Sequence, residues 1–240
     1  MDLNKISIET HRLYTGTNTS HYISDPRFYM DSVLTLLNNN PTGVGINYNE
    51  ISDPNSQFDA IVYKDLINTE VWVQNKINMS EFHYKEKAVP IQWEYTDETK
   101  KIEQYTAQKA TTNYGGRSYD AWFTLEVPIP DGPYVFSGLP GLILELYDTE
   151  KEYHFTLVSF SPLKEKYQVN SERISGKRTT KQAFIKAYKS YKANPAVSVA
   201  RDLPDGVEIR GANGNVITKR ELIRETKEYE RKRNNQIEKW

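Results

Sequence analysis

Cysteine is absent from the 240-residue sequence. This absence excludes disulfide bonds, thiolate metal ligands, cysteine nucleophiles and lipidation at a cysteine. It does not identify a redox compartment, because a chain in a reducing cytosol and an envelope protein that avoids cysteine both fit it.

The sequence also lacks an excess of charge of either sign. Its 31 Lys and Arg residues nearly cancel its 32 Asp and Glu residues, which leaves a formal net charge of -1. No overall field would attract nucleic acid or an anionic membrane, so nucleic acid is not an expected partner.

Long apolar runs are missing as well. No stretch approaches the roughly 18 apolar residues of a membrane-spanning helix, and no apolar signal region follows Met1. We therefore expect no transmembrane segment. If the natural protein is exported, its export signal is absent from this sequence.

Motifs for catalysis and cofactor binding are absent too. The chain has no Walker phosphate loop, Gly-rich dinucleotide fingerprint, HExxH zinc helix or GxSxG nucleophile elbow. The glycines of "SGLPGL" (residues 137–142) enclose Pro140, which lacks the amide that a phosphate-binding loop would donate. We expect no cofactor.

The histidines are few and scattered, at His11, His21, His83 and His154. None has a second histidine at the spacing of a helical metal pair, and His11 and His21 would meet only if their strands pair. Scattered histidines are more often structural or exposed, so no metal site is predicted. No activated serine is placed beside His83 or His154, which leaves no catalytic triad.

Carboxylates are plentiful in the middle of the chain. A pair at glycosidase-like separation is not excluded by sequence, but Asp and Glu on the polar faces and turns of a sheet are ordinarily solvated. A hydrolase is therefore an alternative function, resting on Arg117, Glu126 or Asp131. The carboxylates concerned are Glu94, Asp97, Glu98, Glu103, Asp120, Glu126 and Asp131.

Tyrosine is frequent, with 17 residues against 8 Phe and 4 Trp, and it suits half-buried antiparallel strands. From residue 58 onward, apolar and polar residues alternate, which predicts antiparallel strands. Asp97–Lys100 is the expected hairpin loop between strands 91–95 and 101–110. Further strands are predicted in "RSYDAWFTLEVPI" (117–129), with Trp122 on the face opposite Ala121 and Phe123, and in "LILELYD" (142–148) and "YHFTLVSFSPL" (153–163).

Helical spacing occurs in three places. Residues 28–37 and 179–195 carry apolar stripes, and residues 219–240 are highly charged with pairs at i, i+4; residues 38–55 are loop-like. We predict a single domain, 1–240, with an antiparallel core at 58–160 and a helical part at 179–240. Its class is α+β and β-rich, with a strongly curved, open half-barrel-like meander around a helix.

The stretch "TTNYGGRSYDAW" (111–122) places two glycines before an arginine flanked by aromatics. In a functional interpretation, Arg117 holds a carboxylate or phosphate while Tyr114, Tyr119 and Trp122 wall the site. In a structural interpretation, Gly115 and Gly116 form a hairpin turn or bulge, and Arg117 stacks on an aromatic ring or pairs with Glu126. The structural interpretation is favoured.

Two turns are predicted in "PDGPYVFSGLPGLILELYD" (130–148). Asp131-Gly132-Pro133 makes the first. Pro140 and Gly141 fit positions i+1 and i+2 of a type II turn, in which Gly141 takes positive φ. Gly141→Val is therefore expected to disturb folding more than any separable activity. The structural turn residues are Gly115, Gly116, Gly132, Pro133, Gly138, Pro140 and Gly141.

The stretch 108–148, "QKATTNYGGRSYDAWFTLEVPIPDGPYVFSGLPGLILELYD", closely resembles the signature region of the GLPGLI family, whose name is the hexapeptide Gly138–Ile143. Arg117, Ala121-Trp122 and Gly132-Pro133 also match the pattern. The resemblance covers about residues 58–160 well and extends upstream through "WEYTDETKKIEQYTAQKA" (93–110). The family is essentially uncharacterised, so it assigns no catalytic residue.

The resemblance implies a Bacteroidota envelope protein of the periplasm or outer-membrane periphery, with an outer-membrane TonB-dependent receptor or another envelope protein as partner. The leading hypothesis is thus a noncatalytic binding protein. The alternative is a carrier of a small apolar or peptidic ligand on the concave face of the sheet. Candidate binding residues are Trp93, Arg117, Tyr119, Trp122, Tyr134, Phe136 and Leu139.

Overall fold

The structure is a computed structural model that describes residues 7–29, 32, 58, 60–78, 80–87, 91–163, 174–195, 215–232 and 238–239. Residues 25–29 are helical, which overlaps the start of the helix predicted at 28–37. Most of that helix, and the whole loop predicted at 38–55, lie outside the described residues.

The first sheet has six strands in the order β1-β2-β3-β4-β5-β11. Neighbouring strands in this sheet are antiparallel, except that β11 lies parallel to β5. The strands are β1 His11–Thr15, β2 Thr19–Ser24, β3 Ile61–Asp65, β4 Glu70–Ile77, β5 Ser80–Lys87 and β11 Lys177–Thr179.

The second sheet has five antiparallel strands in the order β10-β9-β8-β7-β6. It contains the strands predicted at 142–148 and 153–163, the latter in a shorter form. The strands are β6 Glu94–Ile102, β7 Tyr105–Tyr114, β8 Arg117–Thr124, β9 Leu142–Asp148 and β10 His154–Thr156.

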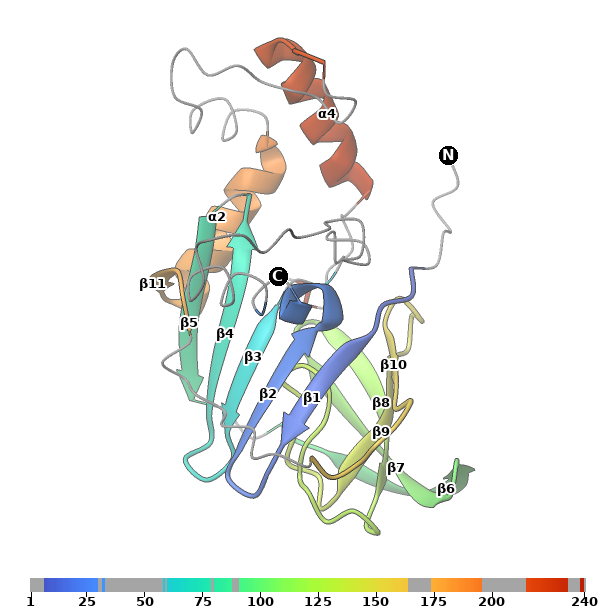
Figure 1. The fold of residues 1–240 in the computed structure, drawn as a ribbon. Coiled ribbons are helices and arrows are strands. Elements are labelled where there is room, and N and C mark those ends of the chain that lie inside the picture. Colours follow the sequence, from blue (N-terminus) through green and yellow to red (C-terminus); the bar gives the residue numbers. More distant parts are fainter. Residues whose placement is uncertain are drawn as a thin grey trace.

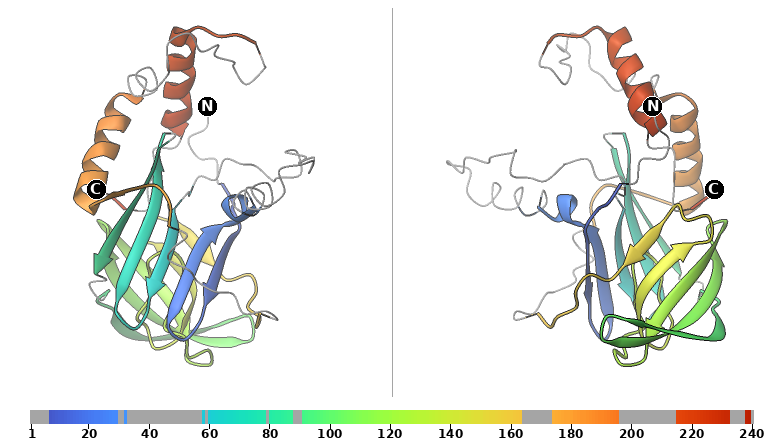
Figure 2. Two further views of the ribbon diagram at one scale, coloured as in Figure 1. Left: turned by 60° about the vertical axis from the view of Figure 1, so that its left-hand side comes forward. Right: turned by 90° about the vertical axis from the view of Figure 1, so that its right-hand side faces the viewer.

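The two sheets face each other across the main hydrophobic core (Figures 1 and 2). Val62, Val73 and Tyr84 come from the first sheet, and Ala121 and Leu146 come from the second. Period-2 alternation places these residues on the inner faces. The β-rich α+β class is confirmed, and the strands that the structure describes divide between two sheets, without closing into a barrel, instead of forming one curved sheet.

Two described helices follow the sheets in the sequence. Helix α2 (Lys181–Ala193) begins at Thr180, whose side chain caps Ala183 N–H, and it buries Phe184 and Tyr191. It contacts β5 and β4, and its Phe184 ring packs against Phe82 and Tyr84 (Figure 1), so the helix predicted within 179–195 is confirmed. Helix α4 is Lys219–Lys232. No helix within the described ranges is both long and apolar enough to cross a membrane.

The hairpin predicted at Asp97–Lys100 is wrong. These residues lie within β6, and the chain turns at Glu103 and Gln104 instead. β6 is the outermost strand of its sheet and is largely exposed. Its polar side chains therefore resemble a turn in sequence, while they protect a sheet edge in the structure.

The loop between β8 and β9 enters the space between the sheets. Phe136 and Leu139 in this loop are fully buried. Lys64 Nζ, on the inner side of β3, lies 2.5 Å from Asp131 Oδ1 and donates to the carbonyl oxygens of Gly132 (2.7 Å) and Phe136 (3.4 Å). A single buried ammonium thus fixes both ends of the segment 131–136.

The type II turn predicted for Pro140-Gly141 is also wrong. Positive φ occurs at Gly138 (91°), and Gly141 is not among the positive-φ residues. Gly141 is instead required by close approach, because a Cβ there would lie 1.8 Å from the carbonyl oxygen of Thr124. The prediction that Gly141 is a folding residue is retained for a different physical reason.

Replacement of Gly141 by Ala should therefore destabilise the protein far more than replacement of Gly138 by Ala. A Cβ at Gly138 meets nothing within 4 Å, so only its backbone conformation is disfavoured, by about 1–2 kcal/mol. At position 141 the backbone of β8 must move. Urea unfolding of both variants measures the difference, and equal midpoints would contradict the close-approach argument.

Lys64→Met and Asp131→Leu should each cost roughly 3–5 kcal/mol, because each leaves a buried charge unpaired. The double variant should cost less than the sum of the single variants. Lys76→Met is the matched control, because Lys76 lies on the neighbouring strand β4, is 38% exposed and pairs with Glu81 at 3.6 Å. Its loss should cost about 1 kcal/mol or less. An additive double-variant cycle measured by chemical denaturation would refute the coupling.

Candidate functional site: a carboxylate held by two tyrosines and a lysine

Arg117, singled out by the sequence, is buried at the start of β8. Its Nη1 lies 2.9 Å from Asp148 Oδ2 and 3.5 Å from Glu150 Oε2, and it also bonds Glu152 Oε2. Its guanidinium carbon lies 5.2 Å from the centre of the Tyr153 ring. The stacking of Arg117 on an aromatic ring agrees with the favoured structural interpretation. The ion-pair partners of Arg117 are Asp148, Glu150 and Glu152, however, and not Glu126, which accepts a hydrogen bond from Thr106 N–H.

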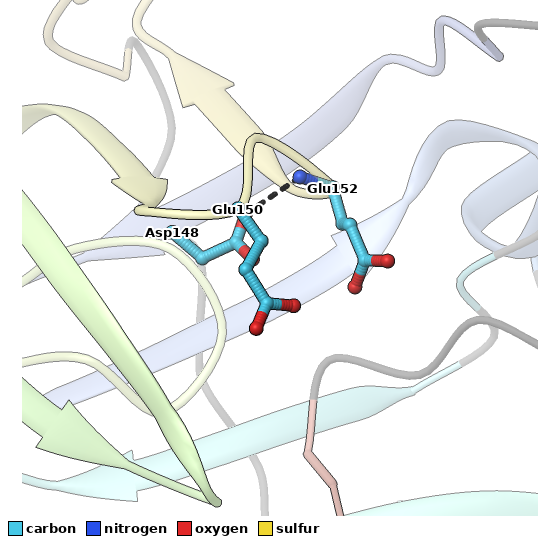
Figure 3. Close-up of side chains that lie close together, drawn as sticks. All are labelled: Asp148, Glu150 and Glu152. Carbon is cyan, nitrogen blue, oxygen red and sulfur yellow. Dashed lines mark hydrogen bonds between the residues drawn. The ribbon is translucent and has the colours of Figure 1, made fainter. Parts of the chain in front are cut away.

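Asp148, Glu150 and Glu152 place one carboxylate oxygen each within 4.8 Å of one another (Figure 3). The turn after β9 brings them together, since Asp148 Oδ1 accepts the backbone N–H groups of Glu152 and Tyr153. Such a group has the donor chemistry for a hard cation. The Arg117 guanidinium already lies among these oxygens and supplies the positive charge, so the geometry is explained as an ion-pair network.

The carboxylate of Glu238 is bound by three donors from other parts of the chain. Its side chain is 3% exposed. Glu238 Oε1 accepts a hydrogen bond from Tyr134 Oη at 2.7 Å and a longer one from Tyr114 Oη at 3.4 Å. Lys181 Nζ lies 2.9 Å from Glu238 Oε2. We call the group formed by Tyr114, Tyr134 and Lys181 the carboxylate site.

Four parts of the fold build the carboxylate site. Tyr114 ends β7, Tyr134 lies in the loop between β8 and β9, and Lys181 is the first residue of α2. The inner face of β5 contributes Glu86, which lies 3.3 Å from Lys181 Nζ, and Tyr84. The site therefore exists only when both sheets, the loop and the helix are in place.

The hydroxyl groups of the site are kept as hydrogen-bond donors. Burial raises the pKa of Tyr134 and of Tyr114 far above the usual range, and the nearby Glu238 carboxylate adds to both shifts. Burial alone would lower the pKa of Lys181, but Glu238 and Glu86 outweigh it and raise that pKa. At neutral pH the site thus presents two protonated phenols and one ammonium to an anion.

Tyr84 gives the site an additional polar atom. Its hydroxyl is buried and has no hydrogen-bond partner among the described residues. Burial raises its pKa, and the Glu238 carboxylate is the second cause of that shift. The hydroxyl therefore lies in the electrostatic field of the bound carboxylate without contacting it.

The structure does not bring the candidate binding residues from the sequence together in one place. Tyr134 contacts the Glu238 carboxylate, whereas Arg117 pairs with Asp148 and Tyr119 lies opposite Asp148 in the β8–β9 pairing. Trp93 Nε1 donates to Ser137 O. Trp122 belongs to another hydrophobic cluster, where Lys100 covers its ring at 4.2 Å, as expected for its opposite face. Phe136 and Leu139 fill the space between the sheets instead of lining a concave surface.

His11 and His21 do not meet. In the β1–β2 pairing, His11 lies opposite Ser24 and Tyr14 lies opposite His21, which directs the two histidines to opposite faces. His11 stacks on Tyr22, and His21 stacks on Tyr63. Both rings are thus packed against tyrosine.

Sequence reasoning missed Lys181 and Glu238. Tyr134 and Glu238 are 104 residues apart, and the sequence predicted helix around both missed residues, where Lys and Glu are common. The sequence singled out both tyrosines of the site, Tyr114 as a wall beside Arg117 and Tyr134 as a candidate binding residue, but no local pattern linked them to Lys181 or Glu238.

Arg117→Gln should lower the melting temperature, because three carboxylates lose their common cation. A loss of roughly 3 kcal/mol corresponds to a fall of about 6–12 °C in a protein of this size. Millimolar Ca²⁺ should restore part of the lost melting temperature of the variant by screening the exposed carboxylate oxygens, whereas the melting temperature of the wild type should not change. Differential scanning calorimetry measures both effects, with Lys100→Gln as the control without an acidic triad. An equal Ca²⁺ response in the wild type would refute the interpretation.

Comparison with known proteins supports the family resemblance over one short segment. Residues 116–145, from the β7–β8 turn into β9, match a family described as "Protein of unknown function (Porph_ging)". No curated protein matches the chain.

Two solved structures share the fold. "Structure of PNGF-II in P21 space group" is 13% identical with a TM-score of 0.51, and "Structure of PNGF-II in C2 space group" is 14% identical with a TM-score of 0.50. The match covers 78% and 79% of this chain but 31% of each of those chains. At this low sequence identity, the similarity to these structures shows a shared fold alone. The chain is thus a β-rich protein with a segment typical of an uncharacterised family.

Proposed function

We propose that this protein is a noncatalytic binding protein of the cell envelope, and that its carboxylate site receives an acidic side chain from an extended segment of a protein partner. The resemblance of residues 108–148 to the GLPGLI family supports the location, in the periplasm or at the outer-membrane periphery. It also supports an outer-membrane TonB-dependent receptor as the partner class.

The observation that carries the proposal is the capture of the Glu238 carboxylate. Two buried hydroxyls and an ammonium surround it at 2.7, 3.4 and 2.9 Å. Charge-assisted hydrogen bonds of this kind are about twice as strong as neutral ones. Glu238 is remote in sequence from all three donors, so the site holds its carboxylate as it would hold one from a separate chain.

The hydrolase hypothesis finds less support, because its three candidate residues are occupied. Asp131 pairs with Lys64, Glu126 accepts a hydrogen bond from Thr106 N–H, and Arg117 pairs with the acidic group after β9. Each of these interactions stabilises the fold locally. The carrier hypothesis is weakened by Phe136 and Leu139, which occupy the interior that an apolar ligand would need.

Removing a single donor should release the partner. Tyr134→Phe deletes only a hydroxyl, and Lys181→Met keeps the aliphatic stem of the lysine while deleting its charge. Affinity purification of the tagged full chain from its own host, at native expression, should recover an outer-membrane receptor with the wild type. Either variant should recover at least fivefold less.

Lys100→Met serves as the matched control, since Lys100 pairs with Glu145 on another part of the second sheet. Circular dichroism of each variant verifies folding. Undiminished recovery with both site variants would refute the proposal. Turnover of an envelope substrate by the purified protein, abolished by changing one carboxylate, would refute its noncatalytic part.

A further inference from the structure

This inference rests on the proposed function and concerns the regulation of the same site. We propose that Glu238–Lys239 is a built-in competitor, which occupies the carboxylate site in place of an external peptide with an acidic residue followed by a basic one. Three groups define the peptide that the site would bind: a carboxylate, a backbone amide and a positively charged side chain.

The backbone contact lies at the turn between β7 and β8. The N–H of Lys239 donates to Gly115 O at 2.5 Å. A Cβ at Gly115 would lie 2.7 Å from Glu238 Cγ, and a Cβ at Gly116 would lie 2.9 Å from Lys239 O. The two glycines therefore leave room for a peptide backbone to approach the turn directly.

The basic position is defined by Glu150. Lys239 Nζ pairs with Glu150 Oε2, which also lies 3.5 Å from Arg117 Nη1. The hydrogen bond from Lys239 is the main cause that lowers the pKa of Glu150. Lys239 is 41% exposed and Glu150 54% exposed, so this contact adds selectivity for a basic residue more than it adds affinity.

Two features leave Glu238 an imperfect occupant of the carboxylate site. Glu86 shares Lys181 with it, and Glu238 adds to the effect of burial in raising the pKa of Glu86, which indicates repulsion between the two carboxylates. The buried Tyr84 hydroxyl has no described partner. An external peptide that offers Tyr84 an acceptor would satisfy a group that Glu238–Lys239 does not reach.

The arrangement predicts that emptying the site raises its affinity for added peptide. A tethered occupant competes at an effective concentration on the order of millimolar. The probe is a fluorescein-labelled peptide Gln-Ile-Glu-Lys-Trp, which reproduces residues 236–240. Titrated by fluorescence anisotropy against the full chain, it should bind Glu238→Ala at least tenfold more tightly than the wild type.

Two controls test the chemistry of the site. The same peptide with Gln in place of Glu should not bind Glu238→Ala, and the double variant Glu238→Ala/Tyr134→Phe should bind the acidic peptide at least fivefold more weakly than Glu238→Ala. Lys239→Glu replaces an exposed ion pair by a repulsion with Glu150 and leaves the buried carboxylate in place. It should therefore bind the peptide several-fold more tightly than the wild type, even if Glu238→Ala fails to fold.

The outcomes separate the two proposals. Equal binding by the wild type and the variants would show a working site without internal competition, and would overturn this inference alone. No binding by any folded variant would overturn the site itself, and the proposed function with it. Binding that is insensitive to the Glu-to-Gln change in the peptide would also overturn the inference.

Discussion

The ion pair between Lys64 and Asp131 is the constraint on which the carboxylate site depends. Both side chains are 1% exposed or less, and bringing two charges out of water is costly unless they pair and their remaining hydrogen-bonding groups are satisfied. Lys64 meets this condition through Asp131, Gly132 and Phe136, and Asp131 Oδ1 also accepts the Gly132 N–H, whereas Asp131 Oδ2 has no hydrogen-bond partner among the described residues. The loop is thereby held so that Phe136 and Leu139 pack between the sheets while the Tyr134 hydroxyl points to Glu238.

Charged groups specify the arrangement of the layers elsewhere too. Lys64 joins β3 to the loop, Arg117 joins β8 to the turn after β9, and Lys181 joins α2 to Glu238. Hydrophobic burial drives the sheets together without direction, whereas each of these buried pairs tolerates one geometry. The apolar core supplies most of the stability, and the ion pairs determine which loop faces which strand.

Local pattern predicted the strands well and failed where tertiary contacts decide. Alternation and apolar content located β3, β4, β8 and β9, because each buries most of its apolar side chains. It misplaced the hairpin in β6, whose exposed polar residues resemble a turn. Gly141 was correctly singled out, but its reason is a neighbouring carbonyl that no local pattern contains. Tyr134 was named as a candidate, while Lys181 and Glu238 were not, since nothing in sequence links groups so far apart.

The separation of 104 residues between Tyr134 and Glu238 also sets an order of events in time. Synthesis delivers a chain from its N-terminus, so the hydroxyls and the ammonium of the site emerge before the Glu238 carboxylate. Lys181 is the last of the three donors and precedes Glu238 by 57 residues, so at about 5–20 residues per second a growing chain contains all three donors for roughly 3–11 s before Glu238 is made. During this interval the two hydroxyls and the ammonium have no carboxylate from residue 238 to bind.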